Sequence, residues 1–248
     1  MEERPRTGHL SIVGLNVASS GASSVGVHRR NPADANDEPS SHTRTRGRLA
    51  HFRRRAGEPR AGGRSPRVTR SAKPGRLDWG DLVRLAERGH EIGGHTESHA
   101  ALTEIPLEQA RQEIARDRDA LTSRGLDPSS FAYPYGKFTD EIADLVRALG
   151  YAAARGVGGV VETVPPLNPY QLRTPHSART WTTADHLAGL TLAAQHEEGW
   201  LILPFHHIGH DRGSTYTTQP GQFTAYLDWL VERDMPVIPV REVIARAN

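Results

Sequence analysis

From residue 76 onward, short apolar segments alternate with single segments whose apolar residues repeat at helical spacing. The strand-like segments begin at Glu91, Phe131, Tyr151, Trp200 and Pro236. Asp78 and Thr139 stand where they would cap two of the intervening helices. Because a single helix separates each strand from the next, the pattern predicts right-handed parallel βα units. Such units build either an open sheet or a barrel, and periodicity alone does not choose between the two.

Residues 1–75 differ in composition from residues 76–248. They carry a net charge of +9, against −7 for the remainder, and Phe52 is their only Trp, Tyr or Phe. Such a segment buries too little apolar surface to offset the loss of chain entropy on folding. We therefore expect residues 1–75 to be largely disordered and residues 76–248 to form the folded domain. Arginine runs without interleaved aromatic residues are more typical of a solvated segment than of a nucleic-acid-binding arm.

The absence of certain features excludes several classes of protein. The chain has no cysteine and thirteen histidines, so any metal site must use His, Asp or Glu ligands. No stretch approaches the roughly 18 consecutive apolar residues of a membrane helix. The apolar stretch Leu10–Ala18 is short, contains Ser and Asn, and follows the acidic Glu2 and Glu3, so it makes a weak secretion signal.

Three groups of polar and aromatic residues follow predicted strands, where parallel α/β folds place their chemistry. The first is His95-Thr96-Glu97-Ser98-His99, whose two imidazoles could bind one divalent ion. A surface or hydrogen-bonded histidine pair is the alternative interpretation.

The second group is Pro134-Tyr135-Gly136, a rigid turn whose backbone N–H groups could face a ligand oxyanion, or an ordinary strand-to-helix turn. The third runs from His206 to Asp211 and includes His207 and His210. His206, at the end of a strand, suits general acid or base catalysis, whereas the cluster as a whole could be a second metal site or a polar loop.

Together these segments resemble a known family. His95-Thr96-Glu97-Ser98-His99, Tyr133-Pro134-Tyr135-Gly136 and Leu203-Pro204-Phe205-His206 look like successive motifs of the polysaccharide deacetylases with the NodB homology domain, carbohydrate esterase family four. The resemblance extends from about Gly75 to Val240. It implies an α/β fold of the distorted (β/α) barrel type. It also implies removal of acetyl groups from N-acetylglucosamine polymers or related acylated sugars with a divalent ion, commonly zinc.

The resemblance assigns roles to individual residues. It implies that His95 and His99 are metal ligands. The backbone N–H of Tyr135 would help to stabilise the tetrahedral oxyanion, and His206 would be the general acid that protonates the leaving amine. Pro134 and Tyr135 would border the substrate.

Trp181 is a further candidate for substrate binding, because its ring could stack on a sugar. A position in the core is the alternative for a tryptophan at the entry of a helix.

The sequence departs from the family at the start of the domain. The family begins with a strand ending in a Thr-Phe-Asp-Asp type motif, which supplies the general base and the third metal ligand, and this chain has no such motif. We therefore expect a barrel without its first strand–helix unit. An Arg-rich, aromatic-poor segment in the place of that unit is also what translation in a shifted reading frame of G+C-rich DNA would produce.

We expect a hydrolase that acts on carbon–nitrogen bonds other than peptide bonds, with reduced or absent turnover. The alternatives are an inactive carbohydrate-binding relative and another histidine–metal hydrolase on a parallel barrel. The expected partner is a polysaccharide or oligosaccharide, with no nucleic acid and no membrane. The family resemblance favours an extracellular or cell-envelope location, and the weak secretion signal leaves a cytoplasmic one open.

Overall fold

The computed structural model describes residues 12–17, 25–26, 77–210 and 214–247. The chain divides into one unit of residues 1–29 with 75–248 and a second unit of residues 30–74. The second unit lies entirely outside the described residues, so the fold below is that of the first.

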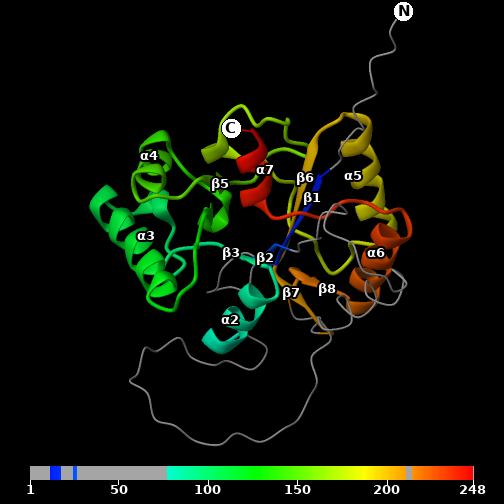
Figure 1. Ribbon diagram of the computed structural model, residues 1–248, viewed down its shortest axis with the longest axis horizontal. Helices are drawn as coiled ribbons and strands as arrows, with labels where there is room; N and C mark the ends of the chain where they lie inside the picture. Colours follow the sequence, from blue (N-terminus) through cyan, green and yellow to red (C-terminus); the bar gives the residue numbers. More distant parts are fainter. Residues whose placement is uncertain (1–11, 18–24, 27–76, 211–213, 248) are drawn as a thin grey trace, which may run out of the picture. The chain divides into compact units, whose positions relative to one another are not determined.

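Short strands and longer helices alternate along the described chain (Figure 1). The strands are β1 Ile12–Val17, β2 Val25–Gly26, β3 Glu91–Ile92, β4 Ser130–Ala132, β5 Ala153–Arg155, β6 Trp200–Phe205, β7 His207–Ile208 and β8 Thr217–Thr218. The helices are α2 Trp79–Glu87, α3 Leu107–Thr122, α4 Asp140–Ala148, α5 Ala184–His196, α6 Pro220–Glu232 and α7 Val240–Ala247. Short 3-10 turns span Leu102–Glu104, Pro134–Gly136 and Pro169–Gln171.

Parallel pairing joins most of the strands. β4 pairs with β5 and β1 pairs with β6, both in parallel. A parallel bridge between Gly94 and Phe131 places the chain just after β3 beside β4. Another parallel bridge joins Arg155 of β5 to Leu172. The prediction of parallel βα units is therefore confirmed, while β2 and β3 form a small antiparallel pair.

Local sequence signals set the helix boundaries. Asp78 accepts a hydrogen bond from the Asp81 N–H at 2.8 Å while the Asp81 carboxylate accepts from the Asp78 N–H at 2.9 Å, which is a capping box. Thr139 caps α4 through the Ile142 N–H. Gly150, after α4, has a φ of 84°, a left-handed conformation that glycine adopts at little cost. Both predicted caps are confirmed.

The core centres on β6, all six of whose residues are buried. Leu201, Leu203 and Phe205 pack in one cluster with residues of α5 and α6. Trp200 and Ile202 pack on the opposite side with residues of α7. This period-two division is what a parallel strand covered on both faces requires.

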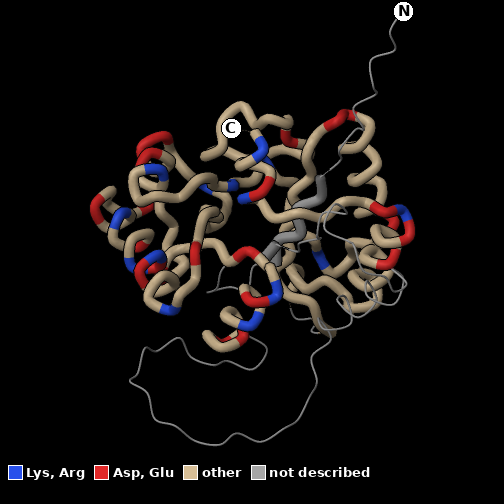
Figure 2. The backbone as a smooth tube through the Cα atoms, in the orientation of Figure 1, with Lys and Arg blue, Asp and Glu red and all other residues tan. Residues whose placement is uncertain are grey.

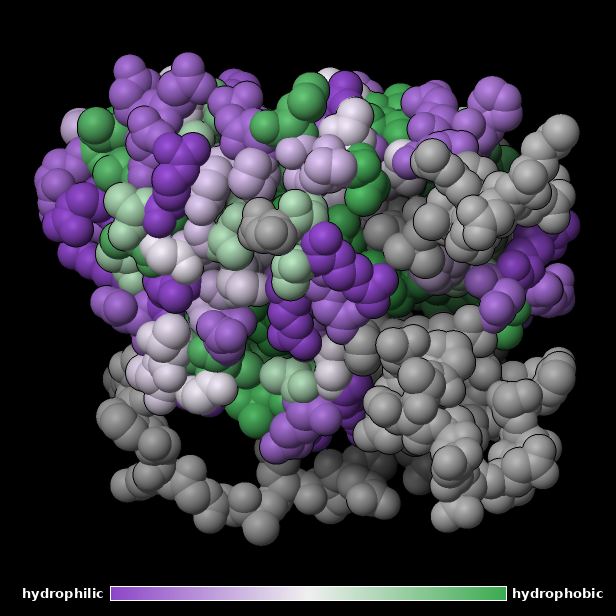
Figure 3. Space-filling model, turned by 45° about the horizontal axis from the view of Figure 1, so that its top comes forward, coloured by the Kyte–Doolittle hydropathy of each residue, from purple (hydrophilic) through white to green (hydrophobic). Residues whose placement is uncertain are grey.

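Charged residues lie mostly along the helices and loops rather than in the strands (Figure 2). On the face shown in Figure 3, hydrophilic residues gather at the left, where Figure 1 places α3 and α4. These two helices pack on each other and on β4 through a second core cluster that includes Ile114, Phe131 and Val146. Within the described residues, no helix is long and apolar enough to cross a membrane.

One expectation about the N-terminal segment is wrong. Ile12–Val17 form a six-residue strand that runs parallel to β6, from the pair Ile12–Trp200 to the pair Val17–Phe205. The run of Ile, Val and Leu that resembles a weak secretion signal therefore supplies a sheet strand. The chain therefore has a strand before residue 76, contrary to the expectation that the first strand is missing. Most of residues 1–75 lie outside the described residues.

The last predicted strand is also wrong. Residues 236–239 form no strand, and α7 begins at Val240. Pro236 and Pro239 explain the difference, because proline has no N–H to donate to a strand ladder.

Candidate active site

The site forms where neighbouring strands end. His95 follows Gly94, which bridges to Phe131 of β4, and Ala132 of β4 is paired with Arg155 of β5. His206 directly follows the last residue of β6. Segments far apart in sequence thus deliver their side chains to the carboxyl ends of the strands, as expected for parallel α/β folds.

His95 is held from two sides. Its Nδ1 lies 2.6 Å from the carbonyl oxygen of Ala132, so Nδ1 carries the proton and donates it. Its backbone N–H donates to the Asp117 carboxylate at 2.7 Å. Burial lowers the pKa of His95 from 6.5 to about 3, so the imidazole is neutral with Nε2 unprotonated. An imidazole fixed in this way through Nδ1 presents Nε2 as a metal donor.

His99 lies against His95, as predicted from their spacing. The two ring centroids are 4.8 Å apart in an edge-to-face arrangement, and the ring of His99 has the same separation from the ring of Tyr135. The structure therefore brings the two predicted metal ligands together and adds Tyr135 beside them.

Helix α3 holds the loop that carries the two histidines. The Glu113 carboxylate accepts hydrogen bonds from the Ser98 N–H at 2.8 Å and from the Ser98 hydroxyl at 2.9 Å. The Glu113 carbonyl accepts from the Glu97 N–H at 3.1 Å. Asp117, one turn later, holds the His95 N–H. The sequence did not reveal the roles of Glu113 and Asp117, since the apolar pattern of α3 predicts a helix but not which loop its acidic residues contact.

Three residues of the site have left-handed backbone conformations. Thr96, His99 and Tyr135 have φ values of 66°, 63° and 58°. The other non-glycine residues of this kind in the described chain, Glu198 and Asp234, follow the ends of helices, where such a conformation is common. A β-branched residue with positive φ is a true outlier, and backbone strain of this kind clusters at functional sites.

The turn after β4 leaves one backbone donor available. The Gly136 N–H donates to the Tyr133 carbonyl and the Lys137 N–H to the Pro134 carbonyl. Proline has no N–H, and the described residues contain no acceptor for the N–H of Tyr135. This is the donor to which the family resemblance assigns the oxyanion. Pro134 is buried, so it shapes the turn, whereas the Tyr135 side chain is exposed.

His206 lies partly buried beside the ring of Tyr216, at 4.9 Å between centroids. Its Nδ1 is buried and has no hydrogen-bond partner among the described residues. Burial and the positive charge of Arg155 lower the pKa of His206 from 6.5 to about 4. The imidazole is therefore neutral near pH 7 and must gain a proton before it can act as an acid.

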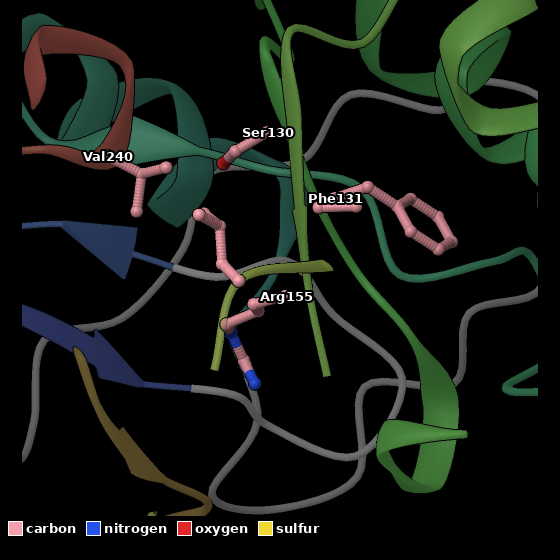
Figure 4. A pocket seen from close by; sticks show the side chains of 6 residues that line it. Ser130, Phe131, Arg155 and Val240 are labelled. Atoms are coloured by element: carbon pink, nitrogen blue, oxygen red, sulfur yellow. The ribbon is translucent and has the colours of Figure 1, made fainter. Parts of the chain in front are cut away.

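Arg155 is a site residue that sequence reasoning missed. It is buried at the end of β5, and burial lowers its pKa from 12.5 to about 10. It borders a narrow pocket with Ser130, Phe131 and Val240, and Figure 4 shows its side chain extending away from Ser130. Its charge also contributes to the lowered pKa of His95, although burial is the larger cause. Its place at the site follows from the pairing of Arg155 with Ala132 between β4 and β5, which the sequence pattern does not report.

The metal site is incomplete in the described part of the chain. No group of three or more His, Asp or Glu side chains that could hold an ion is found there. His207 is not part of such a group within the described residues; its Nδ1 lies 3.3 Å from the Thr217 hydroxyl across the β7–β8 pair.

Comparison with known proteins agrees with this geometry. A family model described as polysaccharide deacetylase matches residues 61–154, which include the histidine pair and the Pro134–Gly136 turn. The curated peptidoglycan-N-acetylmuramic acid deacetylase PdaC of Bacillus subtilis is 30% identical over 67 residues. Over residues 61–154 this chain is similar to the polysaccharide deacetylase family. The match to PdaC covers 27% of this chain and 14% of PdaC.

Solved structures show the same fold. A polysaccharide deacetylase-type protein of Mycobacterium smegmatis is 14% identical, with a TM-score of 0.52 over 68% of this chain and 66% of its own. The Xyl-CE4 domain of a multidomain xylanase from the hindgut metagenome of Trinervitermes trinervoides is 13% identical. Its TM-score is 0.50 over 96% of this chain and 91% of that one. This chain thus has the predicted α/β fold of the NodB barrel type, built here from partial sheets.

Proposed function

We propose that this chain is a metal-dependent hydrolase of the type that removes acetyl groups from an N-acetylglucosamine-type polysaccharide or a related acylated carbohydrate, with impaired turnover. The observation that carries the proposal is the contact of His95 with His99 at the carboxyl ends of the strands, beside the ring of Tyr135. The match of residues 61–154 to the polysaccharide deacetylase model supports deacetylation of a carbohydrate. The metal and the polymer are the parts of the proposal that need direct measurement.

The residues present fit part of a divalent metal site. His95 and His99 would hold the ion, because two neutral imidazoles are suitable ligands and Nδ1 of His95 is already satisfied by Ala132. Zinc suits such nitrogen ligands. When bound, a divalent ion would polarise the acyl carbonyl and lower the pKa of the attacking water.

The protein's own groups act around that centre. The Tyr135 N–H would donate a hydrogen bond to the oxyanion of the tetrahedral intermediate, where a fixed donor in a water-poor site is effective. His206 would give a proton to the nitrogen that leaves as the amine. Because His206 is neutral at rest, with its pKa lowered to about 4 by burial, it must first take up that proton.

The described residues provide no evident general base. Within the described residues no carboxylate joins His95 and His99 in a group of three. General acid–base groups typically contribute about 10²–10⁴-fold to rate. We therefore expect little or no turnover by this chain. This observation also favours the second candidate function, that of a carbohydrate-binding relative without catalysis.

One experiment separates the two candidates. Purified full-length chain with added zinc is assayed for acetate release from acetylated chito-oligomers and from acetylxylan. Slow release that His206→Ala abolishes supports the hydrolase, whereas sugar binding with no release supports the non-catalytic relative. Robust release that is insensitive to His206→Ala would contradict the roles given to both acid and base.

We also propose an extracellular or cell-envelope location, because polysaccharides of this type occur there. Cell fractionation of the producing organism tests this proposal directly.

A further inference from the structure

One guanidinium and two aromatic rings gather beside His206. The Cζ atom of Arg179 lies 4.2 Å from the ring centroid of Tyr216 and 6.0 Å from that of Trp181. The Tyr216 ring in turn lies 4.9 Å from the ring of His206. We call Arg179, Trp181 and Tyr216 the arginine–aromatic platform.

The backbone of the platform is fixed although its rings are exposed. The Thr180 N–H donates to the Thr215 carbonyl at 3.0 Å, and the Thr180 hydroxyl donates to the Ser214 carbonyl at 3.0 Å. The Arg179 N–H donates to the Thr182 hydroxyl at 2.8 Å. The two bonds of Thr180 join the loop that carries Arg179 and Trp181 to the loop that carries Tyr216, and the third bond lies within the first loop. A surface ordered in this way loses less entropy when it binds a ligand.

The rings face solvent to a degree that core packing does not explain. Trp181 is 68% exposed and Tyr216 is 42% exposed. The interpretation of Trp181 as a core residue is therefore wrong. Exposed aromatic groups next to a catalytic candidate are typical of a binding surface, and the flat apolar face of an indole packs well against the C–H groups of a sugar ring.

The charge of Arg179 is available for a ligand. Several arginines of the described chain form ion pairs, as Arg173 does with Glu162 and Arg147 with Asp144. No carboxylate in the described ranges forms such a pair with Arg179. A guanidinium binds carboxylates through paired, charge-assisted hydrogen bonds, which are stronger than neutral ones.

We propose that the arginine–aromatic platform binds a sugar ring that carries a carboxylate, adjacent to the ring whose acyl group is processed at His206. The sugar ring packs on Trp181, and its carboxylate binds Arg179. The natural substrate is then an acidic glycan rather than a neutral one. This inference rests on the proposed function, which gives the class of polymer, and it further specifies that the polymer is negatively charged.

The test compares two ligands that differ only in charge. Isothermal titration calorimetry measures binding to the full-length chain of the N-acetylglucosamine tetramer and of the same tetramer oxidised at C6 to carboxylates. We expect the acidic tetramer to bind about tenfold more tightly, the contribution of one charge-assisted contact. Arg179→Gln should remove this preference and leave the affinity for the neutral tetramer nearly unchanged. Trp181→Ala should weaken both.

A second arginine–aromatic pair supplies the control. Arg233 lies 4.6 Å from the ring centroid of Trp229 at the end of α6, so Arg233→Gln makes the same change elsewhere. It should alter neither affinity, and thermal melting checks that each variant is folded. Equal binding of the two tetramers, binding of neither, or a preference that survives Arg179→Gln would overturn the proposal. Acetate release from the neutral tetramer is measured separately, so a failure of the proposed hydrolase activity is distinguishable from a failure of this inference.

Discussion

His95 and His99 form the smallest unit of the site with a testable chemistry. Their rings are in edge-to-face contact, and Nδ1 of His95 is held by the Ala132 carbonyl. Two imidazoles that hold one ion cannot replace each other, because a single neutral ligand binds zinc weakly. We therefore expect either His95→Ala or His99→Ala to abolish zinc binding, measured by calorimetry and by metal content after dialysis.

The control for this prediction is His186→Ala, since His186 is exposed on α5. It should leave zinc binding unchanged. If both site variants retained zinc, the ion would bind elsewhere, with His206, His207 and His210 as the next residues to replace.

The sequence pattern identified the site residues that lie close behind predicted strands, and it did not reveal those that reach the site from distant segments. His95, His99, Tyr135 and His206 stand directly after strands, so the pattern places them. Asp117 contacts His95 from 22 residues away, and Arg155 reaches the site only through the register of β4 and β5. The left-handed angle of Thr96 has no sequence signal, since a β-branched residue disfavours this conformation.

At the scale of the element, α3 acts as a clamp on the loop that carries His95 and His99. Glu113 holds Ser98 through two hydrogen bonds, and this restrains a loop with two left-handed residues. Loss of groups that orient metal ligands typically lowers metal affinity by about 10–100-fold. We expect Glu113→Ala to weaken zinc binding about tenfold with little change in melting temperature, as measured by competition with a fluorescent chelator.

Glu108→Ala is the matched control on the same helix. The Glu108 carboxylate is exposed, and among the described residues it bonds only to Arg111 and Gln112 within α3. This variant should bind zinc as the unmodified chain does. An equal loss of affinity in both variants would mean that the effect arises from the helix as a whole and not from the clamp.

The elements that could be predicted are those with a complete local signal. β6 has six consecutive buried residues, and α2 and α4 have side-chain caps, so their positions followed from the sequence. β1 was missed because Gly14 and Asn16 interrupt its apolar run, and its partner β6 is about 190 residues away. Its existence depends on a parallel pairing that no local pattern reports.

For the whole molecule, burial of neutral histidines makes stability depend on pH. Burial lowers the pKa of His95 to about 3 in the folded state, against 6.5 in the unfolded chain. Between these values the unfolded chain binds a proton that the folded chain does not. The contribution is therefore fully present above pH 6.5 and is lost progressively as the pH falls toward 3. The pKa of His206, lowered to about 4, acts in the same direction.

We accordingly expect the metal-free protein, in the presence of a chelator, to lose stability when the pH falls from 7.5 to 5. Each unit of separation from the unfolded pKa is worth about 1.4 kcal/mol, so His95 alone should lower the free energy of unfolding by about 2 kcal/mol at pH 5. Urea denaturation at both pH values measures the change. His95→Asn, whose side-chain amide can still donate to the Ala132 carbonyl, should remove that part of the pH dependence, whereas His186→Asn on exposed α5 should not. An unchanged pH dependence in His95→Asn would mean that His95 takes up a proton as readily in the folded protein as in the unfolded chain.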